Sequence, residues 1–158
     1  MYHAIRVVLT VVLLSVGCRF PDYPIDELLT APELIEIGGR ELFVEAQLYR
    51  GFQPVCPPDG NPMFAVIWVV PSDSMPFPTS VDFDYLWVVN KEYDVWVTGF
   101  DEARTAIEDN KLRKMAFDGP KWDVEPYPVL ADVVVRVTDG HGNAYLLRAA
   151  DQIISILW

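Results

Sequence analysis

Residues 129–149 read VLADVVVRVTDGHGNAYLLRA, and this stretch decides the fold. Two runs rich in apolar residues, 129–138 and 144–149, flank the segment Asp139-Gly140-His141-Gly142-Asn143. Strand-forming runs on either side of a glycine-rich loop predict a β-hairpin. Residues 152–157 are again apolar, and we expect one more strand there.

Similar signals recur nearer the N-terminus. Residues 34–37 and 41–49 flank Gly38-Gly39, and a glycine pair readily adopts the positive φ angles of a tight hairpin turn. Residues 63–70 are apolar on both faces, which predicts a central strand. Alternating residues predict two further strands, at 82–90 and 93–98.

The alternation within 82–90 also predicts which side chains share a face. One face is expected to hold Phe83, Tyr85, Trp87 and Val89, and the other Asp82, Asp84, Leu86 and Val88.

The region after residue 98 has a weaker pattern. We expect one short helix from Phe100 to Asn110, with Asp101 as its N-cap and Ala103, Ala106 and Ile107 on one side. Residues 111–118 fit a helix or a strand, and Gly119-Pro120 ends the segment.

These elements predict an all-β chain. Seven or eight short strands separated by Pro- and Gly-rich turns, with one short helix, are typical of an antiparallel β-sandwich of the immunoglobulin-like type. The Cys…Trp…Cys spacing of true immunoglobulin domains is absent. A small β-barrel is the alternative architecture.

The first 18 residues, MYHAIRVVLTVVLLSVGC, have the organisation of an export signal. Arg6 supplies positive charge, and the apolar run 7–16 is too short to span a bilayer but suits a signal peptide. Its last five residues, Leu14-Ser15-Val16-Gly17-Cys18, resemble the lipobox of bacterial lipoproteins. Gly17 and Cys18 match the two most restrictive positions, whereas Ser15 stands where Leu is commonest.

The resemblance implies that cleavage occurs before Cys18 and that this cysteine becomes a diacylglyceryl cysteine with a further acyl chain, such as palmitate, on its amine. Two acyl chains give stable membrane anchoring. An ordinary secretory signal and an uncleaved anchor are the alternatives. Arg19 stands where Asp often marks inner-membrane retention, so a Gram-negative host is expected to place the protein in its outer membrane.

Three regions follow from this interpretation. Residues 1–17 form the signal peptide, 18–33 a lipidated Pro-rich tether, and 34–158 the β-sandwich domain. The tether is expected to be extended, spanning about 50 Å when fully stretched. Leu28 and Leu29 are apolar enough to dock on the domain.

The charge of the chain is strongly acidic, with a net value of −11. Arg6 is the only charged side chain in residues 1–17, so the mature part holds 11 of the 12 Lys and Arg residues and all 23 Asp and Glu residues. Such a surface repels phosphate, which excludes nucleic acid as a partner. Five cations nevertheless cluster in sequence and are a candidate interaction patch, with a solvated connector as the alternative: Arg104, Lys111, Arg113, Lys114 and Lys121.

The sequence offers little catalytic equipment. His141 is the one histidine after the leader, so a zinc site built from several histidines is excluded. Cys56 has no intrachain partner if Cys18 carries lipid. No catalytic residue, metal or cofactor is predicted. The aromatic residues Tyr85, Trp87, Tyr93 and Trp96 are a candidate binding surface, with core packing as the alternative.

We therefore expect a non-enzymatic, lipid-anchored protein of the cell envelope that binds or scaffolds a protein partner. One alternative is a carbohydrate- or small-ligand-binding module that uses an aromatic face. Another is a hydrolase that uses paired carboxylates.

Overall fold

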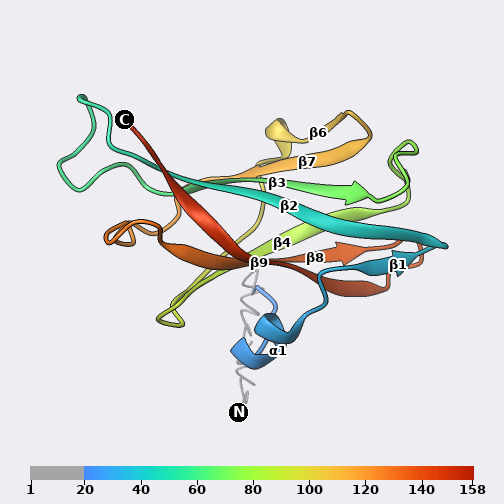
Figure 1. Cartoon of the computed structure of the whole chain (residues 1–158). Coiled ribbons are helices and arrows are strands. Elements are labelled where there is room, and N and C mark those ends of the chain that lie inside the picture. Colours follow the sequence, from blue (N-terminus) through green and yellow to red (C-terminus); the bar gives the residue numbers. More distant parts are fainter. Residues whose placement is uncertain (1–19) are drawn as a thin grey trace, which may run out of the picture.

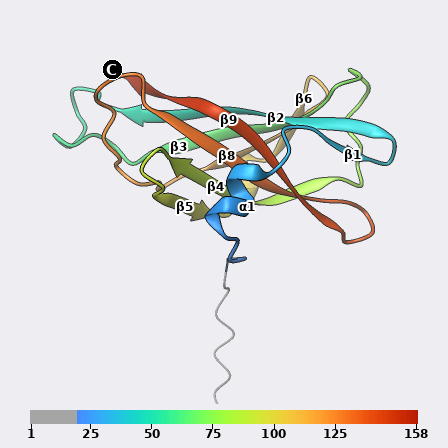
Figure 2. The ribbon, with the colours of Figure 1, turned by 60° about the horizontal axis from the view of Figure 1, so that its bottom comes forward.

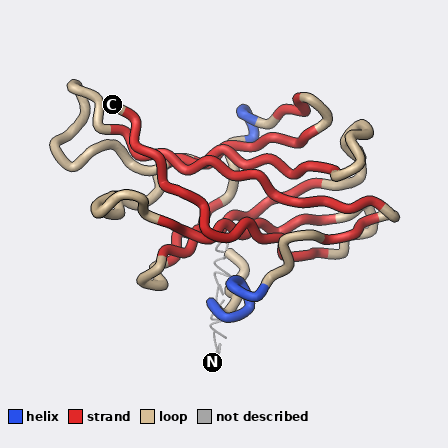
Figure 3. The backbone as a smooth tube through the Cα atoms, viewed as in Figure 1, coloured by secondary structure: helices blue, strands red, loops and turns tan. Residues whose placement is uncertain are grey.

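The computed structural model describes residues 20–158. Residues 1–19, which hold the predicted signal peptide, the lipobox and Cys18, lie outside the described part. Strands dominate this described part, in which helical turns are limited to one short α-helix and one 3-10 turn (Figures 1 and 3). The elements in chain order are α1 (Ile25–Thr30), β1 (Ile35–Ile37), β2 (Arg40–Gly51), β3 (Phe64–Pro71), β4 (Asp82–Asn90), β5 (Val95–Thr98), η1 (Glu102–Arg104), β6 (Ala106–Glu108), β7 (Lys111–Ala116), β8 (Leu130–Thr138) and β9 (Ala144–Leu157).

The strands form one curled sheet in the order β5-β4-β8-β9-β2-β3-β7-β6, and β1 pairs with the start of β2. All pairings are antiparallel except that between β2 and β9, so the sheet is mixed. The two halves of the sheet curl around a common core, which gives the fold a character between half-barrel and sandwich. The all-β prediction is confirmed.

Strand β9 belongs to both halves of the sheet. Its first part pairs with β8, where Val133 lies opposite Ala149. Asp151 then adopts a positive φ of 52°, and the later part runs parallel to β2, with Ile154 opposite Leu48. The ribbon of β9 crosses the centre of the molecule towards the C-terminus (Figure 1). The strand expected at 152–157 is thus the continuation of β9.

The main core lies inside the curl. It receives inward-facing side chains from both halves, because alternate residues of each strand point to this side. Its fully buried members include Leu42 and Leu48 of β2, Ile67 and Val69 of β3, Leu86 and Val88 of β4, Val133 and Val135 of β8, and Leu147 and Ile154 of β9.

The predicted faces of β4 hold only for part of the strand. A β-bulge lies between Phe83 and Tyr85 in the pairing with β8. Because a bulge adds one residue to the strand, it reverses the alternation that precedes it. Phe83 therefore joins Leu86 in the main core, whereas Tyr85 and Trp87 point to the opposite face.

The helix predicted from Phe100 to Asn110 is wrong. Asp101 does act as a cap, since its side chain accepts a hydrogen bond from the Ala103 N–H at 2.9 Å, but the turn that follows is only η1. Asp109 and Asn110 both have positive φ, which suits a tight hairpin turn. This turn joins β6 to β7, and residues 111–116 are a strand.

The segment expected to be an extended tether contains a helix instead. Residues 25–30 form α1, and Leu28 on it is only 1% exposed. Figure 2 shows α1 in front of the strands of the β4–β8 half. The Pro-rich segment therefore packs on the domain.

Candidate functional site

The outer face of β5, β4, β8 and the first part of β9 is covered by residues of this chain. We call it the covered face, and its strand residues are Tyr85, Trp87, Val89, Val95, Val97, Val134 and Leu146. They form a second hydrophobic cluster with Leu28 and Ala31. The ring of Tyr23 meets Trp87 edge to face, with centroids 5.3 Å apart. Trp87 is 2% exposed as a result.

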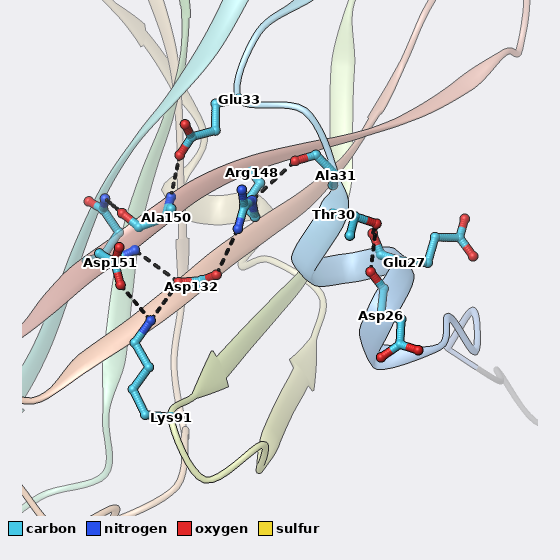
Figure 4. Close-up of polar contacts among 11 residues, drawn as sticks. Asp26, Glu27, Thr30, Ala31, Glu33, Lys91, Asp132, Arg148, Ala150 and Asp151 are labelled. Atoms are coloured by element: carbon cyan, nitrogen blue, oxygen red, sulfur yellow. Dashed lines mark hydrogen bonds and ion pairs between the residues drawn. The ribbon is translucent and has the colours of Figure 1, made fainter.

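A polar network, which we call the clasp, fixes the end of α1 to a β-bulge of β9, where Ala150 and Asp151 lie opposite Asp132 of β8 (Figure 4). Its members are the side chains of Glu33, Lys91, Asp132, Arg148 and Asp151 and the backbone of residues 31, 32 and 148–151. The Asp132 carboxylate accepts hydrogen bonds from the Asp151 N–H at 2.9 Å, Arg148 at 3.1 Å and Lys91 at 3.3 Å. Each buried carboxylate oxygen therefore has a partner.

The charges of the clasp stabilise one another. Burial raises the pKa of Asp132, but the Asp151 amide, Lys91 and Arg148 outweigh this effect, so that the pKa lies below its ordinary value. A hydrogen bond to Asp151 raises the pKa of Lys91. The network therefore favours the ionised states of Asp132 and Lys91.

Arg148 extends the clasp to the chain that follows α1. Its Nε donates to the Ala31 carbonyl at 3.2 Å, and its backbone N–H donates to the Pro32 carbonyl at 2.9 Å. The Glu33 carboxylate accepts from the Ala150 N–H at 3.0 Å. Hydrogen bonds thus hold three successive residues of the predicted tether against β9.

The predicted aromatic surface does not exist as one surface. Trp87 lies beneath α1, and Trp96, 8% exposed, points into the main core. Tyr85 is half-buried between Phe20 and Arg136, whose guanidinium lies 4.4 Å from its ring centroid. Tyr93, 62% exposed, lies in the turn between β4 and β5. Alternation places Trp87 and Trp96 on opposite faces, which explains the error.

The opposite side of the molecule, the outer face of β2, β3 and β7, carries another set of aromatic and polar side chains. We call it the open face, and define it by Phe43, Glu45, Gln47, Tyr49, Phe64, Val66, Trp68, Val70, Lys111, Arg113, Met115 and Phe117. These side chains belong to neither hydrophobic cluster. Phe64, Trp68 and Met115 are half-buried. Sheet pairing orders them in rows, such as Glu45–Trp68–Arg113 and Gln47–Val66–Met115.

One end of the open face is a ladder of stacked rings. Phe64 lies between Tyr49 and Phe117, with centroid distances of 5.0 and 6.1 Å and interplanar angles of 26° and 22°. The Arg104 guanidinium lies 5.7 Å from the Phe117 centroid. Both faces of the Phe64 ring therefore meet other rings, and those of Phe117 meet a ring and a cation. All three rings of the ladder are half-buried, so each keeps part of its surface exposed.

The other end of the open face is a groove of about 580 Å³ beside Trp68. Its polar lining residues are Glu45, Gln47, Glu108, Asp109, Lys111 and Gln152. Lys111 Nζ lies 2.7 Å from a Glu45 oxygen, and Arg113 lies 3.2 Å from Glu108. Two of the groove's carboxylates thus have cationic partners.

The predicted cationic patch is divided by the fold. Lys111 and Arg113 lie on the open face, and Arg104 borders it. Lys114 points inwards, 2% exposed, with Nζ 3.0 Å from an Asp82 oxygen and 5.4 Å from the Phe83 centroid. Lys121 pairs with Asp59 at 2.8 Å. The patch prediction is therefore wrong for Lys114, while three of its members share one surface.

Sequence reasoning missed the open face. The signal was present in residues 63–70, which are apolar on both faces although the adjoining strand 41–49 has Glu45 and Gln47 on one side. Val66 and Val70 of β3 are buried yet belong to neither cluster. A two-sided apolar strand beside a strand with one polar side indicates that the outer face of this part of the sheet also carries apolar side chains.

Other features of residues 20–158 are limited. The described part contains no group of three or more His, Cys, Asp or Glu residues able to hold a metal. Cys56 is a free thiol, half-buried in the loop after β2. None of the helices in residues 20–158 has the length and apolar character needed to cross a membrane.

Neither family models, nor curated proteins, nor solved structures give a match to this chain.

Proposed function

We propose that this chain is a lipid-anchored, non-enzymatic protein of the cell envelope that binds a protein partner through its open face. The observation that carries the proposal is the ring ladder of Tyr49, Phe64 and Phe117 on a sheet face outside both cores. Apolar side chains left at a surface in this way are typical of protein interfaces.

The geometry of the ladder favours a protein over a sugar as its ligand. A sugar ring packs its C–H groups on the π-face of an aromatic ring, which carries negative charge. In the ladder, the faces of Phe64 and Phe117 meet Tyr49, each other and Arg104. The remaining exposed parts of the rings suit contact with apolar side chains of a partner, and the Arg104 guanidinium beside them suits contact with a carboxylate. We therefore expect the partner to offer an apolar strip with acidic residues near Arg104.

Anchoring by lipid on Cys18 is supported by the lipobox-like sequence Leu14-Ser15-Val16-Gly17-Cys18. Mass spectrometry of the native protein tests it, and the expected N-terminal residue is an acylated Cys18. Replacement Cys18→Ser is expected to release the protein from membranes. An unmodified thiol at Cys18, or a chain that retains Met1, contradicts the anchor.

Site-specific photo-crosslinking in intact cells tests the binding face. A photoreactive phenylalanine at Phe64 is expected to form a defined adduct with one protein, and the adduct is expected to disappear with Arg104→Glu. The matched control is the same amino acid at Val55, which is 94% exposed in the loop after β2. Equal adducts at both positions, or none at Phe64, contradict the proposal.

The groove beside Trp68 supports a second candidate function, the binding of a carbohydrate. Its lining combines one large ring with amide, carboxylate and ammonium groups, the set that hydrogen-bonds hydroxyls around a stacked ring. The indole N–H signal of Trp68 in NMR spectra, assigned with Trp68→Phe, is expected to shift when oligosaccharides of the envelope are added. An unchanged Trp68 signal across a panel of such sugars contradicts this candidate.

A further inference from the structure

Residues 18–33, between the proposed lipid and the strands, can span a much shorter distance than their sequence predicts. An undocked chain over residues 18–33 spans about 50 Å when stretched. In the structure, α1 packs on the covered face through Leu28, and the clasp holds residues 31–33 against β9. Only the residues that precede this docked segment can therefore separate the lipid on Cys18 from the domain.

That docked segment begins close to Cys18. Phe20 already contacts the domain, with its ring 5.7 Å from that of Tyr85 and edge to face. Only Arg19 separates Phe20 from Cys18, and two residue steps span at most about 7 Å. A lipid on Cys18 consequently brings the covered face to within a few ångströms of the bilayer surface.

We infer that residues 20–33 act as a rigid membrane mount, which holds the covered face against the lipid bilayer and turns the open face away from it. This inference rests on the proposed lipid at Cys18. The covered and open faces are the two outer sides of the curled sheet, and in Figure 1 α1 lies on the opposite side of the sheet from β3 and β7. The partner of the open face is thus met on the side away from the membrane.

The side chains around α1 fit such a position. Phe20 is 48% and Tyr93 is 62% exposed, and aromatic rings are favoured at the level of lipid headgroups. Tyr93 lines a cavity of about 170 Å³ together with Leu29 of α1, so it lies on the same side. Asp22, Asp26 and Glu27 are exposed and are repelled by anionic headgroups. The membrane contact is therefore expected to depend on the lipid rather than on charge attraction.

Fluorescence quenching tests the mount on the full-length lipidated protein in phosphatidylcholine vesicles. A fluorescent amino acid is placed at Glu92, beside Tyr93, or at Gln47 on the open face, and some lipids carry a nitroxide quencher on the headgroup. We expect quenching at Glu92 to be several-fold stronger than at Gln47, because stacked sheets alone separate the two faces by about 10 Å. Equal quenching at both positions overturns the inference.

A second test of the mount undocks α1 from the covered face. Leu28→Asp places a charge in the covered cluster and is expected to undock α1, so that quenching at Glu92 falls to the level at Gln47. Thr30→Asp adds the same charge at an exposed position of α1 and is the matched control, with quenching at Glu92 unchanged. If Leu28→Asp increases protease cleavage near α1 without changing the quenching, the mount is wrong.

The anchor and the mount can fail separately. Loss of vesicle binding is expected for Cys18→Ser, and a native protein without lipid on Cys18 contradicts the anchor. In that case a mature chain beginning at Cys18, with Cys56→Ser, is coupled to a maleimide lipid and measured in the same way. Equal quenching at Glu92 and Gln47 in the coupled protein contradicts the mount itself.

Discussion

The two outer faces of this sheet both carry apolar side chains, but a segment of the chain packs on only one of them. On the covered face, Trp87 lies beneath α1 and is 2% exposed. On the open face, Trp68 is half-buried and takes part in neither core. Each tryptophan lies near the middle of a strand that is flanked by strands on both sides. What distinguishes them is the segment that packs on top.

The comparison also separates stability from recognition. Removing water from apolar area stabilises a fold, so the covered face contributes to stability within the chain itself. The open face keeps much of that contribution available for a partner. Mutations on the two faces are therefore expected to affect different measurements.

The largest expected difference comes from matched tryptophan replacements. Trp87→Ala leaves a cavity beneath α1 and is expected to lower the free energy of unfolding by about 3–5 kcal/mol. Trp68→Ala removes a half-exposed ring and is expected to cost about 1–2 kcal/mol. Urea unfolding followed by circular dichroism measures both values. Equal losses remove the distinction between the two faces.

Asp132→Asn tests how much the clasp contributes to the covered face. The replacement leaves Lys91 and Arg148 without their shared carboxylate, and we expect the free energy of unfolding to fall by about 2 kcal/mol. Glu36→Gln, an exposed carboxylate on β1, is the control and is expected to change stability by less than about 0.5 kcal/mol. Similar effects of the two variants show that the clasp is not a stabilising element.

Acid is expected to weaken the covered face through the same carboxylate. The folded pKa of Asp132 lies below the ordinary value of 3.8, so its stabilisation is complete above about pH 4 and is lost as the pH falls through the folded value. Asp73 beside Arg40 and Asp139 beside Asn143 have pKa values of about 2 and act in the same direction at exposed positions. Urea midpoints between neutral and acidic pH should fall less in Asp132→Asn than in the wild type, and parallel curves contradict this assignment.

The smallest expected effect on stability is that of Arg104→Ala. An exposed cation–π contact contributes about 0.5–1 kcal/mol, so the unfolding free energy should fall by no more than this amount. Crosslinking from Phe64 should decrease clearly in the same variant. A large loss of stability with unchanged crosslinking would show that Arg104 serves stability and not partner binding, and would contradict the role proposed for the open face.

The sequence predicts most strands because their alternation and turn residues are local signals. Gly38-Gly39 and the loop 139–143 mark hairpins that the structure contains. The bulge in β4 was missed because it depends on pairing with a distant strand. The β6–β7 hairpin was missed because its turn residues, Asp109 and Asn110, fall at the end of the segment that was predicted to be a helix. Register with β8 decides which way Phe83 points, and β3 makes a strand of residues 111–116, which have no single periodic pattern.

The candidate site was harder to predict than the fold. Tyr85, Trp87, Tyr93 and Trp96 were grouped by nearness in sequence, whereas the ladder combines Tyr49, Phe64 and Phe117 from three different segments. Composition alone does not predict on which of the two apolar outer faces another segment of the chain packs. That outcome depends on α1, whose six residues lie among the prolines Pro21, Pro24 and Pro32, a composition that predicts an extended spacer.

Because β9 pairs with both halves of the sheet, the two halves can be joined only late in folding. Leu48 of β2 pairs with Ile154 of β9, so the joint between the halves forms only when segments about a hundred residues apart meet. Pairings of such long range form slowly. A chain synthesised from its N-terminus therefore lacks the strand that joins the two halves of the sheet until residues 144–157 have been made.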